Sequence, residues 1–128
     1  MNKSENFFYN SFVYSPFFNS FVLKGNNPNI LVIDADTFKL REKFTISNNI
    51  NFKEFKGLDI SYDGIKIILS SDNKFIYRNL LTHEHKILNF QKNITKIKYL
   101  DNDSIVIGDT SGKLHFIDDI TGKVTYHH

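Results

Sequence analysis

The chain has 128 residues and a mass of 15.0 kDa, the size of one domain, and its 41% hydrophobic content, with 13 Phe and 6 Tyr, excludes a disordered protein. The formal charge is +2 and the 16 basic residues are scattered, so neither nucleic acid nor an anionic membrane is an expected partner. Cysteine is absent, which excludes disulfides and thiolate metal sites.

The amino-terminal segment MNKSENFFYNSFVYSPFFNS is rich in aromatic side chains but contains no long uninterrupted apolar run. A secretory signal needs roughly 7–15 consecutive apolar residues, and a membrane-spanning helix needs about 20. We therefore expect no signal peptide, no membrane segment and a cytoplasmic location.

Short β-branched and aromatic runs bounded by Asn, Asp and Gly recur along the chain, whereas the periodicity of amphipathic helices is hard to find. These runs predict twelve strands, at 12–15, 21–24, 29–34, 40–46, 58–61, 65–70, 75–78, 86–90, 94–99, 104–108, 113–118 and 123–127. The connections are too short for helical crossovers, so the pattern predicts an all-β fold of antiparallel meanders.

Three segments align with one another: NILVIDADTFKL, KFIYRNLLTHEHKI and KLHFIDDITGKV. The alignment places Thr37, Thr82 and Thr121 in register, each between two predicted strands, at spacings of 45 and 39 residues. Such spacings are close to the roughly 40–45 residues of a four-stranded propeller blade. The longer spacing has a visible cause in the polar segment SNNINFKEFKG at 47–57, which predicts an enlarged loop.

The segment ITKIKYLDNDSIVIGDTSGKLHFIDDITGKV resembles a WD-repeat unit, with its inner strand, Asp-containing turn, Trp-Asp strand and Thr-Gly turn. LDISYDGIKIILSSDNKFIYRNLLTHEHKI is similar to the same template, with SYDG at 61–64 in place of the Ser-Pro-Asp-Gly turn. FVYSPFFNSFVLKGNNPNILVIDADTFKL retains Ser15 and Pro16 at that turn. The resemblance extends from about residue 10 to the end and implies a β-propeller.

The sequence departs from the WD-repeat pattern in two respects. Trp is absent, so the Trp-Asp pair is replaced by Ile33-Asp34, Arg78-Asn79 and Ile117-Asp118. No Gly-His pair precedes an inner strand, although in the family that His, a Ser, the Trp and an Asp form a hydrogen-bonded set that braces each blade. Ser70 and Asp109 are the candidate remnants of this set.

We expect a single partial propeller domain over residues 1–128, with blade one at about 8–46, blade two at about 55–90 and blade three at about 93–128. Complete propellers typically have about 4–8 blades, so an arc of three leaves an apolar sheet face exposed at each end. Two alternatives would cover these faces: a homodimer in which two arcs form a six-bladed ring, or a partner protein that supplies the missing blades.

The resemblance implies a non-catalytic module that serves as a protein–protein interaction platform or assembly subunit. In the family, the partner usually docks on the loops between the fourth strand and the next inner strand and between the second and third strands. Carried over to this sequence, the interaction residues are Lys24, Asn26, Asn27, Ser71, Asp72, Asn73, Gln91, Asn93, Asp109, Thr110 and Ser111.

No residue pattern points to an enzyme, a metal site or a cofactor. His83 and His85 flank Glu84 in a predicted turn with no further ligand nearby. The segment at 101–103 lacks the Gly and the distant Glu of a calcium loop, so we expect a turn. Asp118 and Asp119 are neighbours on a predicted strand and would point to opposite faces.

The alternative function is that of a small-ligand-binding or enzymatic propeller whose site lies in the central channel and is completed on oligomerisation. Such a site needs polar side chains on the inner strands. The candidates are Asp59, Ser61, Lys96 and Lys98.

Overall fold

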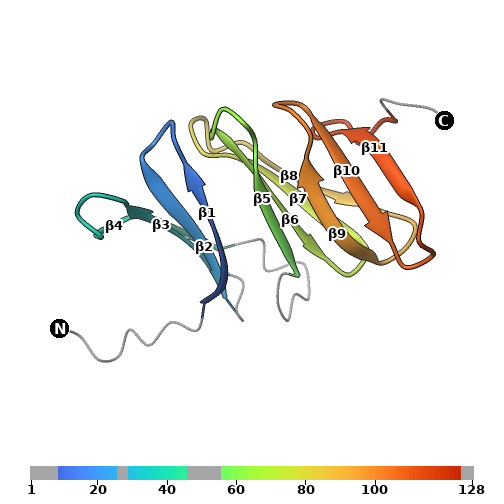
Figure 1. Cartoon of the computed structure of the whole chain (residues 1–128), viewed down its shortest axis with the longest axis horizontal. Helices are drawn as coiled ribbons and strands as arrows, with labels where there is room; N and C mark the ends of the chain where they lie inside the picture. The colour runs from blue at the N-terminus through green and yellow to red at the C-terminus, as the bar shows by residue number, and fades with distance from the viewer. Residues whose placement is uncertain (1–8, 26–28, 46–55, 125–128) are drawn as a thin grey trace.

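The computed structural model describes residues 9–25, 29–45 and 56–124, and this part of the chain forms eleven β-strands and no helix (Figure 1). The strands are β1 Tyr9–Ser15, β2 Ser20–Gly25, β3 Asn29–Asp34, β4 Leu40–Thr45, β5 Gly57–Ile60, β6 Lys66–Ser71, β7 Lys74–Asn79, β8 His85–Asn89, β9 Ile94–Tyr99, β10 Ser104–Asp109 and β11 Leu114–Asp118. Accordingly, no membrane-spanning helix occurs in the described ranges.

The strands form three antiparallel meanders in chain order, which confirms the predicted all-β fold. Sheet one contains β1–β4, sheet two contains β5–β8, and sheet three contains β9–β11. Val124 pairs with Ile117 through an isolated bridge, at the start of the predicted twelfth strand. The remainder of that strand, at 125–127, lies outside the described residues, as do the end of the predicted fourth strand and most of the 47–57 loop.

The three sheets stand side by side, like consecutive blades around an axis (Figure 1). Their first strands lie next to one another, since β1 contacts β5 and β5 contacts β9. Each sheet therefore presents its first strand toward one common side, and the later strands of each meander extend outward from it.

Two apolar clusters hold the sheets together. The first joins sheets one and two through Val22, Ile30, Val32, Phe44, Ile67, Leu69, Ile76 and Leu80. The second joins sheets two and three through Ile68, Phe75, Ile94, Ile97, Tyr99, Ile105, Ile107 and Ile117. Alternate residues of β6 point to opposite faces and enter different clusters, so every residue of this strand is buried. Sheet two is thus packed on both faces, as a propeller blade must be.

The aligned threonines occupy three copies of one turn. The side-chain Oδ1 of Asp34, Asn79 and Asp118 accepts hydrogen bonds from the backbone N–H of Thr37, Thr82 and Thr121, at 2.8, 2.9 and 2.9 Å respectively. The next position has a positive φ in each copy, and it is occupied by Phe38 (58°), His83 (68°) and Gly122 (72°). The repeat read from the sequence is therefore a repeat of turn geometry.

We predict that Phe38→Gly yields a more stable protein than Phe38→Ala, by about 0.5–1 kcal/mol, because a side chain in the left-handed region costs roughly 1–2 kcal/mol and glycine's added freedom in the unfolded chain offsets part of that gain. Both variants remove the same exposed ring, so their difference isolates the backbone term. The measurement is the urea unfolding midpoint of each variant. Equal midpoints would contradict the expected strain.

We also predict that acid weakens the fold through the turn carboxylates. Backbone hydrogen bonds from Thr37 and Asp36 lower the pKa of Asp34. Burial of Asp118 acts in the opposite direction, but hydrogen bonds from Thr121 and Ile120 outweigh it and lower its pKa too. A carboxyl whose folded pKa lies below its ordinary 3.8 stabilises the fold above that pH, and this contribution is lost as the pH falls through the folded pKa.

The double variant Asp34→Asn/Asp118→Asn tests this, because blade two already carries Asn79 at the equivalent position. The amide oxygen keeps the acceptor and does not titrate. The variant's urea midpoint should fall less than that of the wild type between about pH 6 and about pH 3, a window that spans the carboxyl pKa. A fall of the same size in both proteins would contradict the role of these two carboxylates.

Candidate protein-interaction surfaces

Most of the loops proposed as interaction sites lie together along one end of sheets two and three. The N–H of Ile94 donates to the carbonyl of Asp72 at 2.7 Å, and the N–H of Thr110 donates to the carbonyl of Asn93 at 3.0 Å. A third bond joins Phe90 N–H to the carbonyl of Asn73 at 2.6 Å. The loops at 71–73, 91–93 and 109–111 therefore form one continuous strip. Asn26 and Asn27 lie outside the described residues.

The described side chains proposed as interaction residues, those of the strip together with Lys24 of β2, divide into an exposed and a buried group. Lys24, Ser71 and Asp109 are 4%, 6% and 4% exposed, which leaves them unable to contact a partner directly. Asn73 is half-buried and donates to the carbonyl of Phe90 at 3.3 Å. The side chains that face solvent are those of Asp72, Gln91, Asn93, Thr110 and Ser111. We refer to these five residues as the loop strip.

Asp109 organises the loop that carries Thr110 and Ser111. Its Oδ1 accepts a hydrogen bond from the Ser111 hydroxyl at 2.5 Å, and its Oδ2 lies 2.7 Å from Nε2 of His115. These two contacts hold the pKa of Asp109 well below its usual range. The His115 partner was missed by sequence reasoning, because the family's pairing His precedes the inner strand and His115 stands in β11 instead.

The exposed face of sheet one carries a second candidate surface. Phe12, Phe21, Leu23, Ile33 and Phe38 line an apolar hollow of about 300 Å³ on the side that faces away from sheet two. Phe12 is 65% exposed and Phe38 is 74% exposed. The rings of Phe12 and Phe21 meet edge to face, with centroids 5.8 Å apart. This is the exposed apolar end predicted for an unclosed arc.

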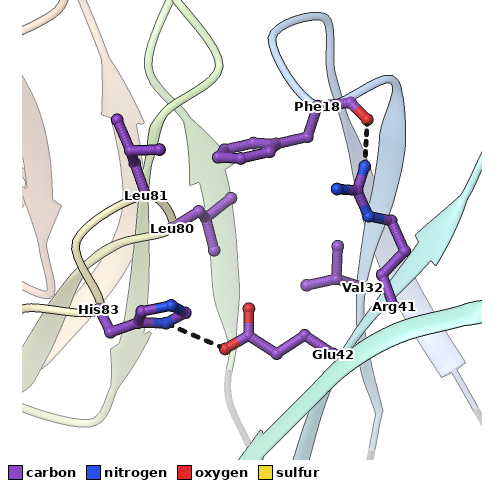
Figure 2. A pocket seen from close by; sticks show the side chains of 7 residues that line it. All are labelled: Phe18, Val32, Arg41, Glu42, Leu80, Leu81 and His83. Carbon is purple, nitrogen blue, oxygen red and sulfur yellow. Dashed lines mark hydrogen bonds and ion pairs between the residues drawn. The ribbon is translucent and has the colours of Figure 1, made fainter.

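A pocket of about 230 Å³ lies between sheets one and two, lined by Phe18, Val32, Arg41, Glu42, Leu80, Leu81 and His83 (Figure 2). Its polar groups already have partners. Arg41 Nη1 donates to the carbonyl of Phe18 at 2.7 Å, and Glu42 Oε2 lies 2.9 Å from Arg78 Nη2 and 3.3 Å from His83 Nδ1. The pocket is therefore a seam that ties two blades together.

The histidine pair does not converge on a common point. His83 turns toward Glu42, whereas His85 is an exposed residue of β8. Within the described residues no group of three or more His, Cys, Asp or Glu side chains is placed to hold a metal ion. At 101–103 the chain forms the expected turn, in which Asp101 Oδ1 accepts from the N–H of Asp103 and of Ser104.

The four inner-strand candidates have different surroundings. Asp59 Oδ2 accepts a hydrogen bond from the N–H of Tyr99 at 2.7 Å and so joins β5 to β9. Ser61 is buried in the β5–β6 turn, where its hydroxyl donates to Asp63 at 2.5 Å. Lys96 and Lys98 are exposed. Asp59 and Ser61 thus have structural contacts: Asp59 joins two strands and Ser61 fixes a turn.

A charged cluster, which we call the Lys66 cluster, joins sheets two and three; the Lys66 and Asp119 side chains are buried, whereas that of Asp103 is exposed. Lys66 Nζ lies 2.9 Å from Asp103 Oδ1 and 2.9 Å from Asp119 Oδ2, and the Tyr99 hydroxyl donates to Asp119 Oδ2 at 2.8 Å. Burial would lower the pKa of Lys66, but hydrogen bonds to the two carboxylates outweigh it and raise that pKa. Burial also raises the pKa of Asp119, whose Oδ1 is enclosed without a hydrogen-bond partner.

Comparison with known sequences finds no matching family model and no matching curated protein. Comparison with solved structures finds propellers. The Cps50 (Swd1) β-propeller domain of Myceliophteria thermophila has a TM-score of 0.71 at 12% identity, covering 91% of this chain and 37% of that chain. The RRP9 WD40 repeats have a TM-score of 0.78 at 6% identity, covering 95% and 38%. Saccharomyces cerevisiae Sqt1 has a TM-score of 0.76 at 14% identity, covering 97% and 35%.

The chain thus spans 35% to 38% of the length of these three structures. At such low identity the likeness concerns the fold. Together with the three meanders and their adjacent first strands, it identifies the chain as a three-blade segment with the WD40 β-propeller fold.

Proposed function

We propose that this chain is a non-catalytic propeller module that works as an assembly subunit and protein-interaction platform. The observation that carries the proposal is the open arc: sheet two is packed on both faces, whereas sheet one presents the apolar hollow of Phe12, Phe21, Leu23, Ile33 and Phe38 to solvent. A contiguous apolar surface of this kind is typical of a protein interface.

The loop strip supports the platform part of the proposal. Its five exposed side chains carry amide, hydroxyl and carboxylate groups, and the loops that bear them are fixed to one another by backbone hydrogen bonds. A prearranged set of polar groups on a rigid sheet scaffold binds a protein partner at low entropic cost. Several of the titratable and hydroxyl groups that chemistry would need are instead engaged in turns and blade contacts.

The test is the mass of the purified chain by light scattering. A mass twice the 15.0 kDa of one chain supports self-assembly into a ring. Aggregation would support an assembly subunit that lacks its partner, provided that it arises from exposed apolar surface. Suppression of the aggregation by a detergent, or binding of an apolar dye, would show that origin. A well-folded monomer that stays soluble on concentration and is silent to the dye would contradict the proposal, since its open face would then need no cover.

A further inference from the structure

Strand register defines equivalent positions in the three sheets. The first residues of β2, β6 and β10 pair with the Asp or Asn that begins the repeated turn: Ser20 with Asp34, Lys66 with Asn79 and Ser104 with Asp118. Residues at the same distance from this first residue are equivalent in β2, β6 and β10. The residues that pair with them across the sheet are then equivalent in the first and third strands. Equivalent side chains must point to the same side of their own sheet.

We call the side of each sheet that faces the preceding sheet its leading face. In sheets two and three this face is occupied by Leu58, Ile60, Ile67, Leu69 and Ile76, and by Ile97, Tyr99, Ile105 and Ile107. The equivalent residues of sheet one are Phe12, Tyr14, Phe21, Leu23 and Leu31. The same position is 4% exposed at Ile97 and 65% exposed at Phe12. Leu31 on this face is 3% exposed, but Phe12 and Tyr14 on β1 are 65% and 43% exposed. Within the described residues, the outer part of the leading face of sheet one therefore lacks the neighbour that covers the same positions in sheets two and three.

The opposite side of each sheet, its trailing face, shows the complementary pattern. Val22, Ile30 and Val32 of sheet one pack against sheet two, and Ile68 and Phe75 of sheet two pack against sheet three. The equivalent residues of sheet three are Val106, Leu114 and Phe116. Ile30 is 0% exposed and Phe75 is 1% exposed, whereas Leu114, at the same position, is 64% exposed. The trailing face of sheet three therefore carries apolar side chains at the positions that are buried on the trailing faces of sheets one and two.

We propose that a second copy of this chain covers both faces head to tail, with the leading face of sheet one of each copy against the trailing face of sheet three of the other. Both halves of the missing contact are present on this chain, in the register that the two internal contacts already use. A twofold axis then creates this contact twice and leaves no open face. The inference rests on the proposed function, because it names the partner of the open arc.

The test uses one charged substitution on each face. Phe12→Lys blocks the leading face, and Leu114→Lys blocks the trailing face; both replace side chains that are more than half exposed in the single chain. Either block removes both contacts of a ring made from identical copies. We expect the wild type to have twice the mass of one chain by light scattering, and each variant alone to have the 15.0 kDa mass of a single chain.

An equimolar mixture of the two variants separates head-to-tail pairing from other arrangements. The mixture retains one unblocked contact, the leading face of Leu114→Lys against the trailing face of Phe12→Lys. We expect its mean mass to rise above that of either variant and to increase with protein concentration, as a dimer held by a single contact requires, whereas each variant alone keeps the mass of one chain at every concentration. Tyr62→Lys is the matched control, because Tyr62 is 68% exposed in the β5–β6 turn and belongs to neither face. Its mass should equal that of the wild type.

Circular dichroism and urea midpoints check that each variant is folded, and Phe38→Lys serves as a second block of the leading face if Phe12→Lys is not. Three results would overturn the inference while leaving an assembly role intact: a dimeric wild type that neither variant dissociates, dissociation by the leading-face variants alone, or a mixture that stays monomeric. A soluble, monomeric wild type would contradict both the inference and the proposed function. The mass of the wild type alone gives this result, without any variant.

Discussion

Lys66→Met should lower the free energy of unfolding by about 3–5 kcal/mol, the range expected when one partner of a buried ion pair is removed. The Lys66 side chain is 9% exposed and that of Asp119 is 0% exposed. Without the ammonium, Asp119 keeps one hydrogen bond from Tyr99, and none of the described residues other than Lys66 forms an ion pair with it. A domain of this size is stable by only about 5–15 kcal/mol, so the loss is a large fraction of the whole.

The matched control is Lys98→Met, because Lys98 stands 4.0 Å from Asp59 but is 63% exposed. An exposed pair contributes about 0–1 kcal/mol, so this variant should stay close to the wild type. The double variant Lys66→Met/Asp119→Asn should recover part of the loss, since it removes the orphaned charge and keeps an acceptor for Tyr99. Equal urea midpoints for Lys66→Met and Lys98→Met would contradict the importance of the cluster.

The loss in Lys66→Met should also depend on pH. Burial already raises the pKa of Asp119, and removing Lys66 takes away an interaction that opposes this rise. An acid whose folded pKa is raised above 3.8 destabilises the fold at high pH and ceases to do so once it is protonated. The deficit measured against wild type should therefore shrink as the pH falls from about 7 toward about 4. A deficit that grows on acidification would contradict this assignment.

The fold could be predicted because its signals are local. A strand that is buried on both faces needs consecutive apolar residues, and Ile67, Ile68 and Leu69 supply them in one run. The turn after each third strand needs a side-chain acceptor and a threonine at fixed spacing, and this requirement put Thr37, Thr82 and Thr121 in register. Both signals depend on neighbours within a few residues, so mutation elsewhere in the chain does not obscure them.

The Lys66 cluster could not be predicted for the opposite reason. Lys66 and Asp119 are far apart in the sequence, and in a chain rich in Lys and Asp neither residue stands out. Sequence reasoning treated Asp118 and Asp119 as neighbours on a strand that point to opposite faces, but β11 ends at Asp118 and Asp119 lies in the following turn. The two carboxylates still have different partners: Asp118 accepts bonds within its own turn, whereas Asp119 reaches Lys66. Which carboxylate pairs with Lys66 depends on how sheets two and three pack against each other, and the spacing of residues in the sequence does not indicate this packing.

The loop strip shows an intermediate case. Its location follows from strand order alone, because the ends of β6 and β10 and the loop after β8 must meet at one edge of adjacent meanders. Burial of individual side chains does not follow from strand order. The sequence marked Asp109 as a candidate remnant of the hydrogen-bonded set that braces WD-repeat blades, but its engagement with His115 became apparent only from the pairing of β10 with β11.

Phe75→Ala should cost about 3–5 kcal/mol, the usual range for deleting a buried aromatic ring. Phe75 is 1% exposed and belongs to the cluster between sheets two and three. Leu81→Ala is the control, because Leu81 is 52% exposed and its truncation should change stability by no more than about 0.5 kcal/mol. Urea unfolding of both variants provides the comparison, and a Phe75→Ala cost near that of Leu81→Ala would mean that the cluster is not a closed core.

The location of the damage in Phe75→Ala tests how the blades depend on one another. Sheet one packs on sheet two through Val22, Ile30 and Val32, a contact that does not include Phe75. When each unit of a repeat array contacts only its neighbours, weakening one interface should loosen the units unequally. Amide hydrogen exchange in β9–β11 should therefore accelerate more than in β1–β4. Uniform acceleration across the described strands would instead show that the three blades unfold as one cooperative unit.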